Sequence, residues 1–302
     1  MTGMADLARE GILVAGAGRA ILLQIADPSV AAGVARHSEF GSRPLDRLHA
    51  TLTFVYALAL GTPDEQRSAA RRVNHAHAPV RAQPGEAAPG YSAFDHDAQL
   101  WVAATLYDTA VQVYELVFGP LDEESRERLH REYAIVGTSL QLPPDRWPPT
   151  RAAFDEYFAA RVAGLHVTAE ARRVSVELMT ARAAPLPVRC LLPLVRLVTA
   201  GLLPDGLRSA YGFRFTPRQQ RRFARRVAAA RAVWPRLPQR LRAAPSAWYL
   251  RAMRERNRTD AARRLGLRRS RTALHSTLAE QSRPHSGPRP ADRGTAVRTM
   301  GA

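Results

Sequence analysis

Hydrophobic residues between Gly11 and about Phe215 recur mostly at intervals of three and four positions, and proline and glycine separate the blocks. This interval is the period of an amphipathic helix, in which one face packs against the core. The chain lacks strong alternating runs joined by dipeptides typical of hairpins, so little strand is expected. We therefore predict an all-α fold, with a single large helical domain over residues 8–256.

Capping and helix-breaking residues place the ends of the individual helices. Pro28 interrupts or restarts an apolar helix that begins near Ile21, and Asp95 is a suitable N-cap for a long apolar helix that ends near Gly119. Residues 81–90 are rich in proline, glycine and alanine and predict a loop. Further helices are expected over residues 46–60, 64–80, 121–136, 150–162 and 219–233.

Composition favours a globular protein that neither crosses a membrane nor is secreted. The 302 residues are 46% hydrophobic, which suffices for a large core. The N-terminus lacks the pattern of a secretory signal, and the apolar stretch 191–203 carries Arg196 and falls short of the ~20 residues needed to span a bilayer. We expect a cytoplasmic protein without a transmembrane helix. An interfacial helix over 191–203, and hence peripheral attachment to the inner membrane face, remains an alternative.

The single cysteine, Cys190, excludes an internal disulfide. Because its neighbours are apolar, we interpret it as a small core residue rather than as a nucleophile.

The net charge of +17 is concentrated near the C-terminus. Residues 217–302 hold 22 arginines and 4 acidic residues, whereas residues 1–216 hold 22 basic and 23 acidic residues and are close to neutral. Residues 257–302 have few apolar side chains and predict a disordered tail. The tail has neither interleaved aromatic residues nor a recognition motif, which argues against nucleic-acid binding. The alternative function is a protein that attaches to nucleic acid or to an anionic membrane through this tail.

Gly16-Ala17-Gly18 superficially resembles the start of a dinucleotide-binding fingerprint. The third glycine of that motif should fall at position 21, which is Ile21, so the spacing fails. We interpret these glycines as sites of close backbone packing instead.

The histidines His37, His49, His75, His77 and His96 are candidate metal ligands. His75 and His77 are two residues apart and point about 200° from each other on a helix, so they cannot share one metal ion as an i, i+4 pair does. A haem needs only one neutral imidazole on its iron, so a single core-facing histidine would suffice.

Arg47 and Thr51 lie four residues apart and therefore share one helical face. A buried guanidinium requires an anionic partner, such as a haem propionate or an internal carboxylate. The alternative is an arginine at the start of a helix that extends to water.

The order and spacing of several motifs over about 11–215 resemble the catalytic domain of the mpaB oxygenase and rubber-oxygenase family. The motifs are Gly18-Arg19-Ala20-Ile21-Leu22-Leu23-Gln24, the run Pro28 to Ser38, Arg47-Leu48-His49-Ala50-Thr51, Gly61-Thr62, His77-Ala78-Pro79-Val80-Arg81, Tyr91-Ser92-Ala93-Phe94-Asp95, Trp101-Val102-Ala103-Ala104-Thr105-Leu106, Pro120-Leu121 and Tyr133.

The resemblance implies a mostly helical fold that encloses a pocket for b-type haem, with a histidine as axial ligand of the iron and a nearby arginine and threonine at the haem. These roles fall on His77, Arg47 and Thr51 of this chain. His75 is the rival ligand, but the family motif runs histidine, two residues, valine, which His77 and Val80 match.

The function that the resemblance implies is a haem-dependent oxidoreductase, in which dioxygen oxidises or cleaves an apolar alkene, for example an isoprenoid. Two departures bear on it, because relatives usually have histidine where this chain has Asp27 and often where it has Ala103. A carboxylate base for the cleavage of rubber is also not identified. A degenerate, non-catalytic member of the family is therefore an alternative.

Overall fold

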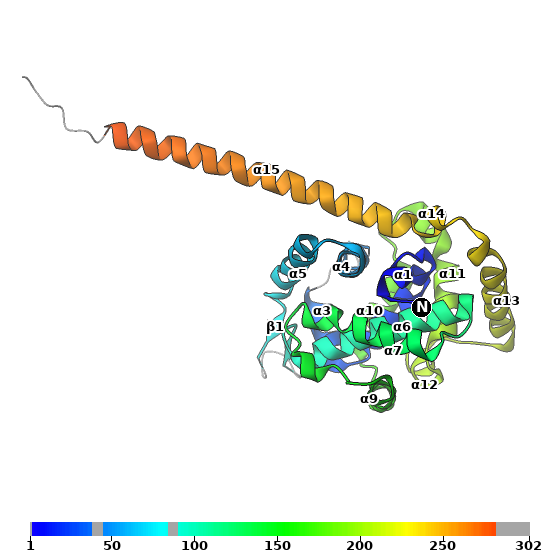
Figure 1. Ribbon diagram of the computed structural model, residues 1–302. Helices are drawn as coiled ribbons and strands as arrows, with labels where there is room; N and C mark the ends of the chain where they lie inside the picture. The colour runs from blue at the N-terminus through cyan, green and yellow to red at the C-terminus, as the bar shows by residue number, and fades with distance from the viewer. Residues whose placement is uncertain (1, 38–44, 84–89, 282–302) are drawn as a thin grey trace, which may run out of the picture. The chain divides into compact units, whose positions relative to one another are not determined.

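The structure is a computed structural model that describes the backbone of residues 2–37, 45–83 and 90–281, and the side chains of these residues up to 263. It confirms the all-α prediction (Figure 1). In the described part of the chain, strand is limited to one antiparallel pair, in which Arg81 faces Ser92 and Ala82 faces Tyr91. The chain divides into two units, Met1–Arg254 and Glu255–Ala302.

The elements follow one another in this order: α1 (Met4–Ala8), η1 (Gly11–Gly16), α2 (Ala17–Ile25), α3 (Pro28–His37), α4 (Asp46–Leu60), α5 (Pro63–His77), β1 (Arg81–Ala82), β2 (Tyr91–Ser92), α6 (His96–Phe118), α7 (Glu123–Tyr133), α8 (Ile135–Thr138), η2 (Pro144–Arg146), α9 (Arg151–Ala163), α10 (Ala169–Thr180), α11 (Leu186–Leu202), α12 (Asp205–Ala210), α13 (Pro217–Val233), η3 (Trp234–Arg236), α14 (Gln239–Arg242) and α15 (Ala244–Gln281).

Most predicted helices are present, and their ends differ for local reasons. Helix α5 ends at His77 rather than at Val80. Ala78 still has helical backbone angles, but Pro79 has no amide N–H with which to continue the hydrogen bonds of the helix. Helix α15 extends to Gln281, and alanine, arginine and leucine, which favour helix, are frequent in its last part. The boundary at residue 256 between the helical domain and a disordered tail stays a prediction. Residues 282–302 lie outside the described residues.

The core forms around the packing of α2 against α6. Trp101 of α6 is fully buried, and its indole Nε1 donates a hydrogen bond of 3.1 Å to the Leu23 carbonyl of α2. Beside it, Tyr107, His130, Trp147 and Phe154 form an aromatic cluster that joins α6, α7 and α9. These contacts fix α6 as the central helix of the unit.

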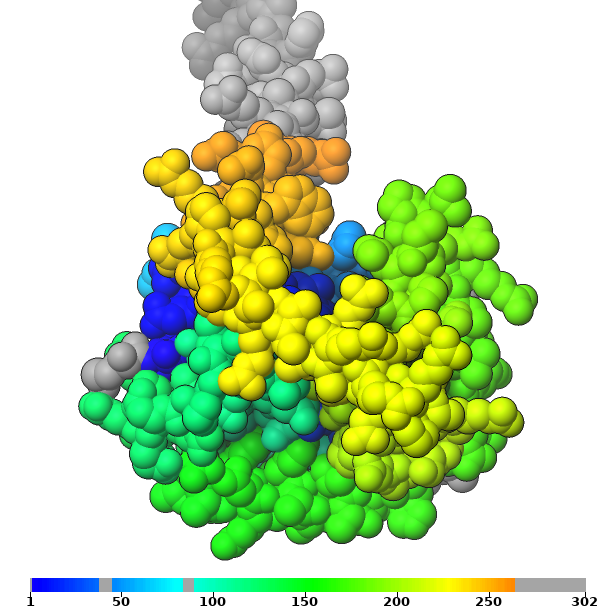
Figure 2. All heavy atoms as spheres, turned by 90° about the vertical axis from the view of Figure 1, so that its right-hand side faces the viewer, coloured from blue at the N-terminus to red at the C-terminus, as the bar shows by residue number. Residues whose placement is uncertain are grey.

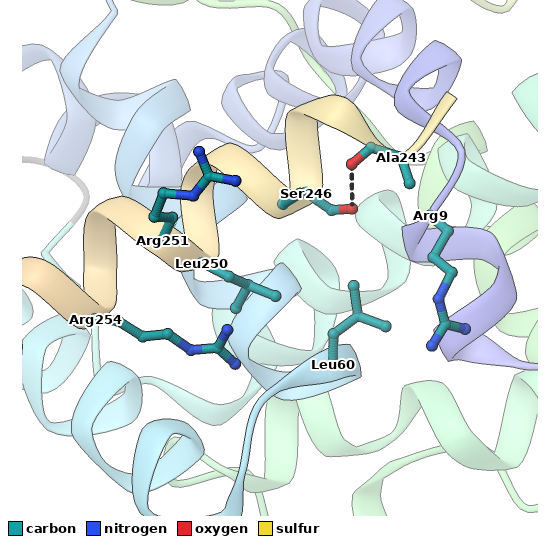
Figure 3. A pocket seen from close by; sticks show the side chains of 8 residues that line it. Arg9, Leu60, Ala243, Ser246, Leu250, Arg251 and Arg254 are labelled. Carbon is teal, nitrogen blue, oxygen red and sulfur yellow. Dashed lines mark hydrogen bonds between the residues drawn. The ribbon is translucent and has the colours of Figure 1, made fainter. Parts of the chain in front are cut away.

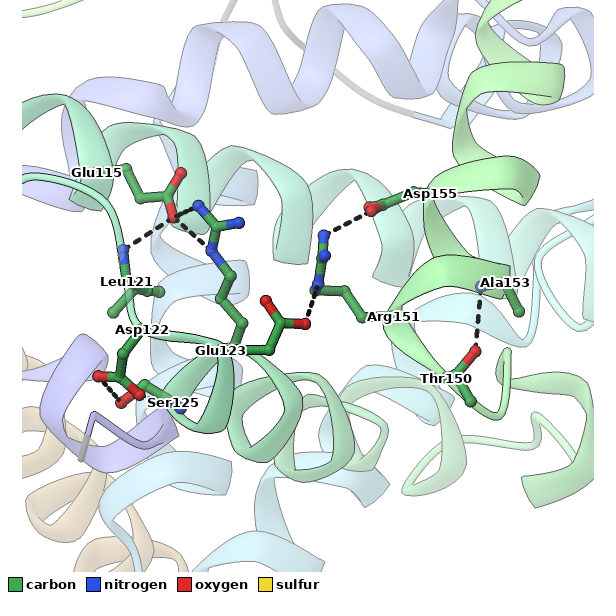
Figure 4. A network of polar contacts seen from close by, with 10 residues as sticks. Glu115, Leu121, Asp122, Glu123, Ser125, Thr150, Arg151, Ala153 and Asp155 are labelled. Carbon is green, nitrogen blue, oxygen red and sulfur yellow. Dashed lines mark hydrogen bonds and ion pairs between the residues drawn. The ribbon is translucent and has the colours of Figure 1, made fainter.

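Ion pairs between α6, α7 and α9 reinforce this packing at the surface (Figure 4). The Arg126 guanidinium of α7 donates from Nε and Nη2 to one carboxylate oxygen of Glu115, at 3.0 and 2.6 Å. Arg151 of α9 donates to Asp155 at 2.6 Å and lies 3.4 Å from Glu123. Exposed pairs of this kind add up to about 1 kcal/mol each, so apolar burial remains the main source of stability.

A buried arginine connects α2 with α6 and α11. The Arg19 guanidinium, only 3% exposed as a residue, forms an ion pair of 2.6 Å with Asp108 and donates hydrogen bonds to Thr109 Oγ1 and to the Leu202 carbonyl. Burial raises the pKa of Asp108, although the charge of Arg19 opposes this shift. The arrangement satisfies a buried cation that would otherwise be costly.

The glycines of the false dinucleotide motif lie in η1 and α2, where they allow close packing as expected. A Cβ atom on Gly16 would lie 2.5 Å from Thr109 Cγ2, and one on Gly18 would lie 2.1 Å from Thr199 Oγ1. No strand precedes this helix in the described chain before it, so the fold of a dinucleotide site is missing.

Two expectations about apolar segments can be compared with the structure. Among the described residues, no single helix has both the length and the hydropathy to cross a membrane, and the bent pair Gly11–Ile25 and Pro28–His37, at 109° to each other, meets these criteria only together. The interpretation of Cys190 as a core residue is wrong, because Cys190 is exposed on α11. Leu191 beside it is exposed whereas Leu192 is buried, so apolar neighbours did not indicate on which side of the helix Cys190 lies.

Candidate functional site

Helices α4 and α5 form an antiparallel hairpin that brings the predicted site residues to one end (Figure 1). Thr62 caps α5 by accepting a hydrogen bond from the Glu65 amide, and the Glu65 side chain accepts one from the Thr62 amide. Because this connection is short, α5 runs back along α4. His77 at the end of α5 therefore lies near Arg47 in the first turn of α4. Thr51 lies one turn further along α4.

The His77 side chain combines partial burial with an unused ring nitrogen. Its Nδ1 atom is buried and has no hydrogen-bond partner among the described residues. Burial lowers the pKa of His77, and the nearby positive charge of Arg47 lowers it further. The imidazole is therefore neutral at neutral pH and can act as a ligand or as an acceptor.

Arg47 is accessible to solvent, and yet desolvation by the surrounding protein lowers its pKa. Thr51 is partly buried on the same face of α4. Both interpretations of Arg47, as the partner of an anionic group and as an arginine that extends to water, stay predictions.

The other histidines differ from His77 in their surroundings. His75 is exposed on α5, which matches its expected orientation away from His77. His49 packs against the rings of Trp248 and Tyr249, with centroid distances of 6.1 and 5.7 Å. In the part of the chain that the structure describes, no three histidine, cysteine or acidic side chains converge as a metal site.

A contact that we did not predict lies at the end of α3. His37 Nε2 is 3.0 Å from the Tyr91 hydroxyl, and Tyr91 packs with Ala32 of α3 and with Val80, which follows α5. The segment after His77 is thereby connected to α3. The motif around Tyr91 was visible in the sequence, but no sequence signal paired it with a histidine 54 residues away. Residues 38–44, within the predicted connection between α3 and α4, lie outside the described residues.

The two departures from the family pattern have structural roles of their own. Asp27 caps α3 through hydrogen bonds from the Ser29 amide and hydroxyl, and its other carboxylate oxygen pairs with Arg161 at 2.8 Å. Ala103 is buried in the core of α6. Asp27 therefore links the start of α3 to Arg161 of α9, whereas Ala103 contributes only a small apolar side chain.

A separate hollow of about 400 Å³ lies at the opposite end of α4 (Figure 3). Leu60 and Leu250 form part of its wall, and Arg9, Arg251 and Arg254 surround it. Leu60 is 13 residues from Arg47, about 20 Å along a helix, so this hollow is not the candidate site around His77.

The comparisons with known proteins cover most of the chain. Residues 5–234 match the family described as ER-bound oxygenase mpaB/B'/Rubber oxygenase, catalytic domain. Uncharacterized proteins of Mycobacterium bovis and Mycobacterium tuberculosis are each 31% identical over 208 residues, which span 67% of this chain and 81% of each relative. No solved structure matches the chain. The chain therefore belongs to the family of mpaB and rubber-oxygenase catalytic domains, which supports a general role as an oxygenase.

Proposed function

We propose that this protein is a haem b-dependent oxygenase with His77 as the axial ligand of the iron, acting on an apolar alkene. Membership of an oxygenase family supports the reaction class. The observation that carries the cofactor assignment is the buried Nδ1 atom of His77, which lacks a partner on an imidazole that its environment keeps neutral. Ligation to iron requires such a neutral imidazole.

The neighbours of His77 fit the same cofactor. A haem carries two propionate groups, and the guanidinium of Arg47, close enough to His77 for its charge to lower the pKa of the imidazole, is a suitable partner for one of them. The Thr51 hydroxyl, one turn away on the same face, offers a hydrogen-bond donor and acceptor to the cofactor or the substrate. We therefore assign cofactor binding to His77, Arg47 and Thr51, and a direct part in the reaction to Arg47 and Thr51.

Bound haem would supply the chemistry of dioxygen, so the residues of this chain bind, orient and exclude water. His77 holds the iron side of the cofactor, and Arg47 fixes its orientation through charge. The proposal of an apolar alkene as substrate rests on the family, whose description includes rubber oxygenase.

The experiment is expression with an ample supply of haem precursor, followed by pyridine haemochromogen analysis and measurement of oxygen uptake with short isoprenoid alkenes. We expect a b-type spectrum, and oxygen uptake that depends on both alkene and bound haem. Stoichiometric haem without uptake on any alkene would favour a degenerate member of the family. Absence of haem would contradict the proposal.

A further inference from the structure

The outward face of α11 is apolar, contrary to the usual orientation of a surface helix. Leu186, Leu191, Leu194 and Val195 are 69%, 56%, 41% and 39% exposed, whereas Leu192 on the inner side is buried. Cys190 on the same helix is exposed too. We call the exposed side chains of Leu186, Cys190, Leu191, Leu194 and Val195 the α11 face.

The spacing shows that this is one continuous surface rather than scattered residues. Leu186, Cys190 and Leu194 are four residues apart and lie along one side of the helix, and Leu191 and Val195 form the neighbouring row. This segment belongs to the light green part of the molecule that projects at the right of Figure 2. Contiguous exposed apolar surface of this kind typically marks an interaction site.

The charges along α11 and the segment before it have one sign, between Glu177 of α10 and Asp205 of α12. Residues 178–204 contain Arg182, Arg189 and Arg196 and no acidic residue. All three arginines are exposed, and Arg196 also donates a hydrogen bond of 2.7 Å from Nε to the Met179 carbonyl. Leucine and valine bordered by arginine without acids is the composition of a helix that lies in the interface of an anionic bilayer.

A second copy of this chain fits the face less well. A symmetric dimer through α11 would bring the same arginines close to each other, and the face contains no carboxylate to pair with them. A bilayer with anionic lipids offers both the apolar phase and the negative charge.

We propose that the α11 face is a peripheral docking surface for an anionic lipid bilayer. Its leucine and valine side chains enter the boundary between headgroups and acyl chains, and Arg182 and Arg189 pair with lipid phosphates. The surface is distinct from the arginine-rich C-terminal segment, whose attraction to lipid would be electrostatic only and therefore weak at high salt.

The first test measures co-sedimentation of the full-length protein with vesicles of 70% phosphatidylcholine and 30% phosphatidylglycerol at 0.5 M NaCl. The double variant Leu191→Glu/Leu194→Glu should bind at least tenfold more weakly than the wild type. The matched control is Val233→Glu/Leu241→Glu, which places the same charge on side chains that are 56% and 60% exposed outside the face. The control should stay within twofold of the wild type, and equal loss in both variants would overturn the proposal.

The second test uses Cys190, the single cysteine of the chain, as a reporter on the face. An environment-sensitive fluorophore attached to its thiol should shift its emission to shorter wavelength when the anionic vesicles are added, and lipids brominated near the headgroup should quench it. An unchanged spectrum with vesicles would contradict the proposal. A shift that instead follows protein concentration without vesicles would assign the face to a second copy of the chain.

Discussion

His75 and His77 have the same side chain and are two residues apart, yet the fold gives them different chemistry. His75 is exposed, whereas His77 is partly buried with an unpartnered Nδ1 and a lowered pKa. The helical period predicts that the two point in different directions, and the family motif favours His77. Neither predicts the desolvation of His77, because that depends on how α4 packs against α5.

The lowered pKa of His77 predicts a pH dependence of stability in the haem-free protein. In the unfolded chain the His77 imidazole binds a proton near pH 6.5, and in the folded chain it does so only at a lower pH. The free energy of unfolding is therefore unaffected by this group well above pH 6.5, and it falls as the pH decreases from 6.5 towards the pKa of the folded state. His77→Gln should reduce this slope, which one proton limits to about 1.4 kcal/mol per pH unit. Urea unfolding at pH 7.5 and 5.5 measures the difference. The control His75→Gln should retain the wild-type slope, and an unchanged slope in His77→Gln would argue against a desolvated imidazole.

At the scale of elements, capping residues predicted much of the helical pattern because they act locally. Asp95 accepts a hydrogen bond from the Ala98 amide as the N-cap of α6, and Thr150 does the same for the Ala153 amide in α9. What the sequence could not indicate is which side of a helix meets the core. Cys190 shows this limit. Its apolar neighbours suggested burial, but it lies on the exposed side of α11, which is itself apolar.

The approach of α2 to α11 depends on Gly18. Gly18→Ala would place a methyl group 2.1 Å from Thr199 Oγ1, with the other Thr199 side-chain atoms within 3.3 Å, so the helices must separate or Thr199 must move. We expect a loss of about 1–3 kcal/mol in the free energy of unfolding, measured by urea denaturation.

Two further variants separate steric conflict from the general effect of alanine. Gly206→Ala on α12 meets no atom within 4 Å and should be neutral or slightly stabilising. Thr199→Ala should reduce the cost of Gly18→Ala in the double variant. If the double variant loses as much as the sum of both single ones, the close approach does not cause the effect.

At the scale of the molecule, Glu10 connects the two ends of the Met1–Arg254 unit. Its buried carboxylate accepts a hydrogen bond of 2.9 Å from Trp234 Nε1 and pairs with Arg242, residues more than 220 positions away. The sequence does not indicate that the Glu10 carboxylate accepts a hydrogen bond from Trp234, because a contact at this separation leaves no local pattern. The family match ends at residue 234, so Arg242 lies beyond it.

Glu10→Gln tests this connection. The substitution keeps the shape but leaves the Arg242 guanidinium, whose side chain is only 19% exposed, without its counter-charge, so we expect a loss of about 2 kcal/mol in thermal or urea unfolding. Glu123→Gln removes a carboxylate that is 67% exposed and 3.4 Å from Arg151, and should change stability by less than about 0.5 kcal/mol. Similar effects of the two substitutions would refute the structural role of Glu10.

Haem content tests most directly whether His77 holds the iron of a b-type haem. The matched comparison is between variants of His77 and of its neighbour His75. Wild type, His77→Ala and His75→Ala would be expressed with haem precursor and measured by absorption spectroscopy and pyridine haemochromogen, with circular dichroism to verify helicity. We expect haem near one equivalent in the wild type and in His75→Ala, and little or none in His77→Ala with its helicity retained. Full haem in His77→Ala, or loss only in His75→Ala, would contradict the assignment.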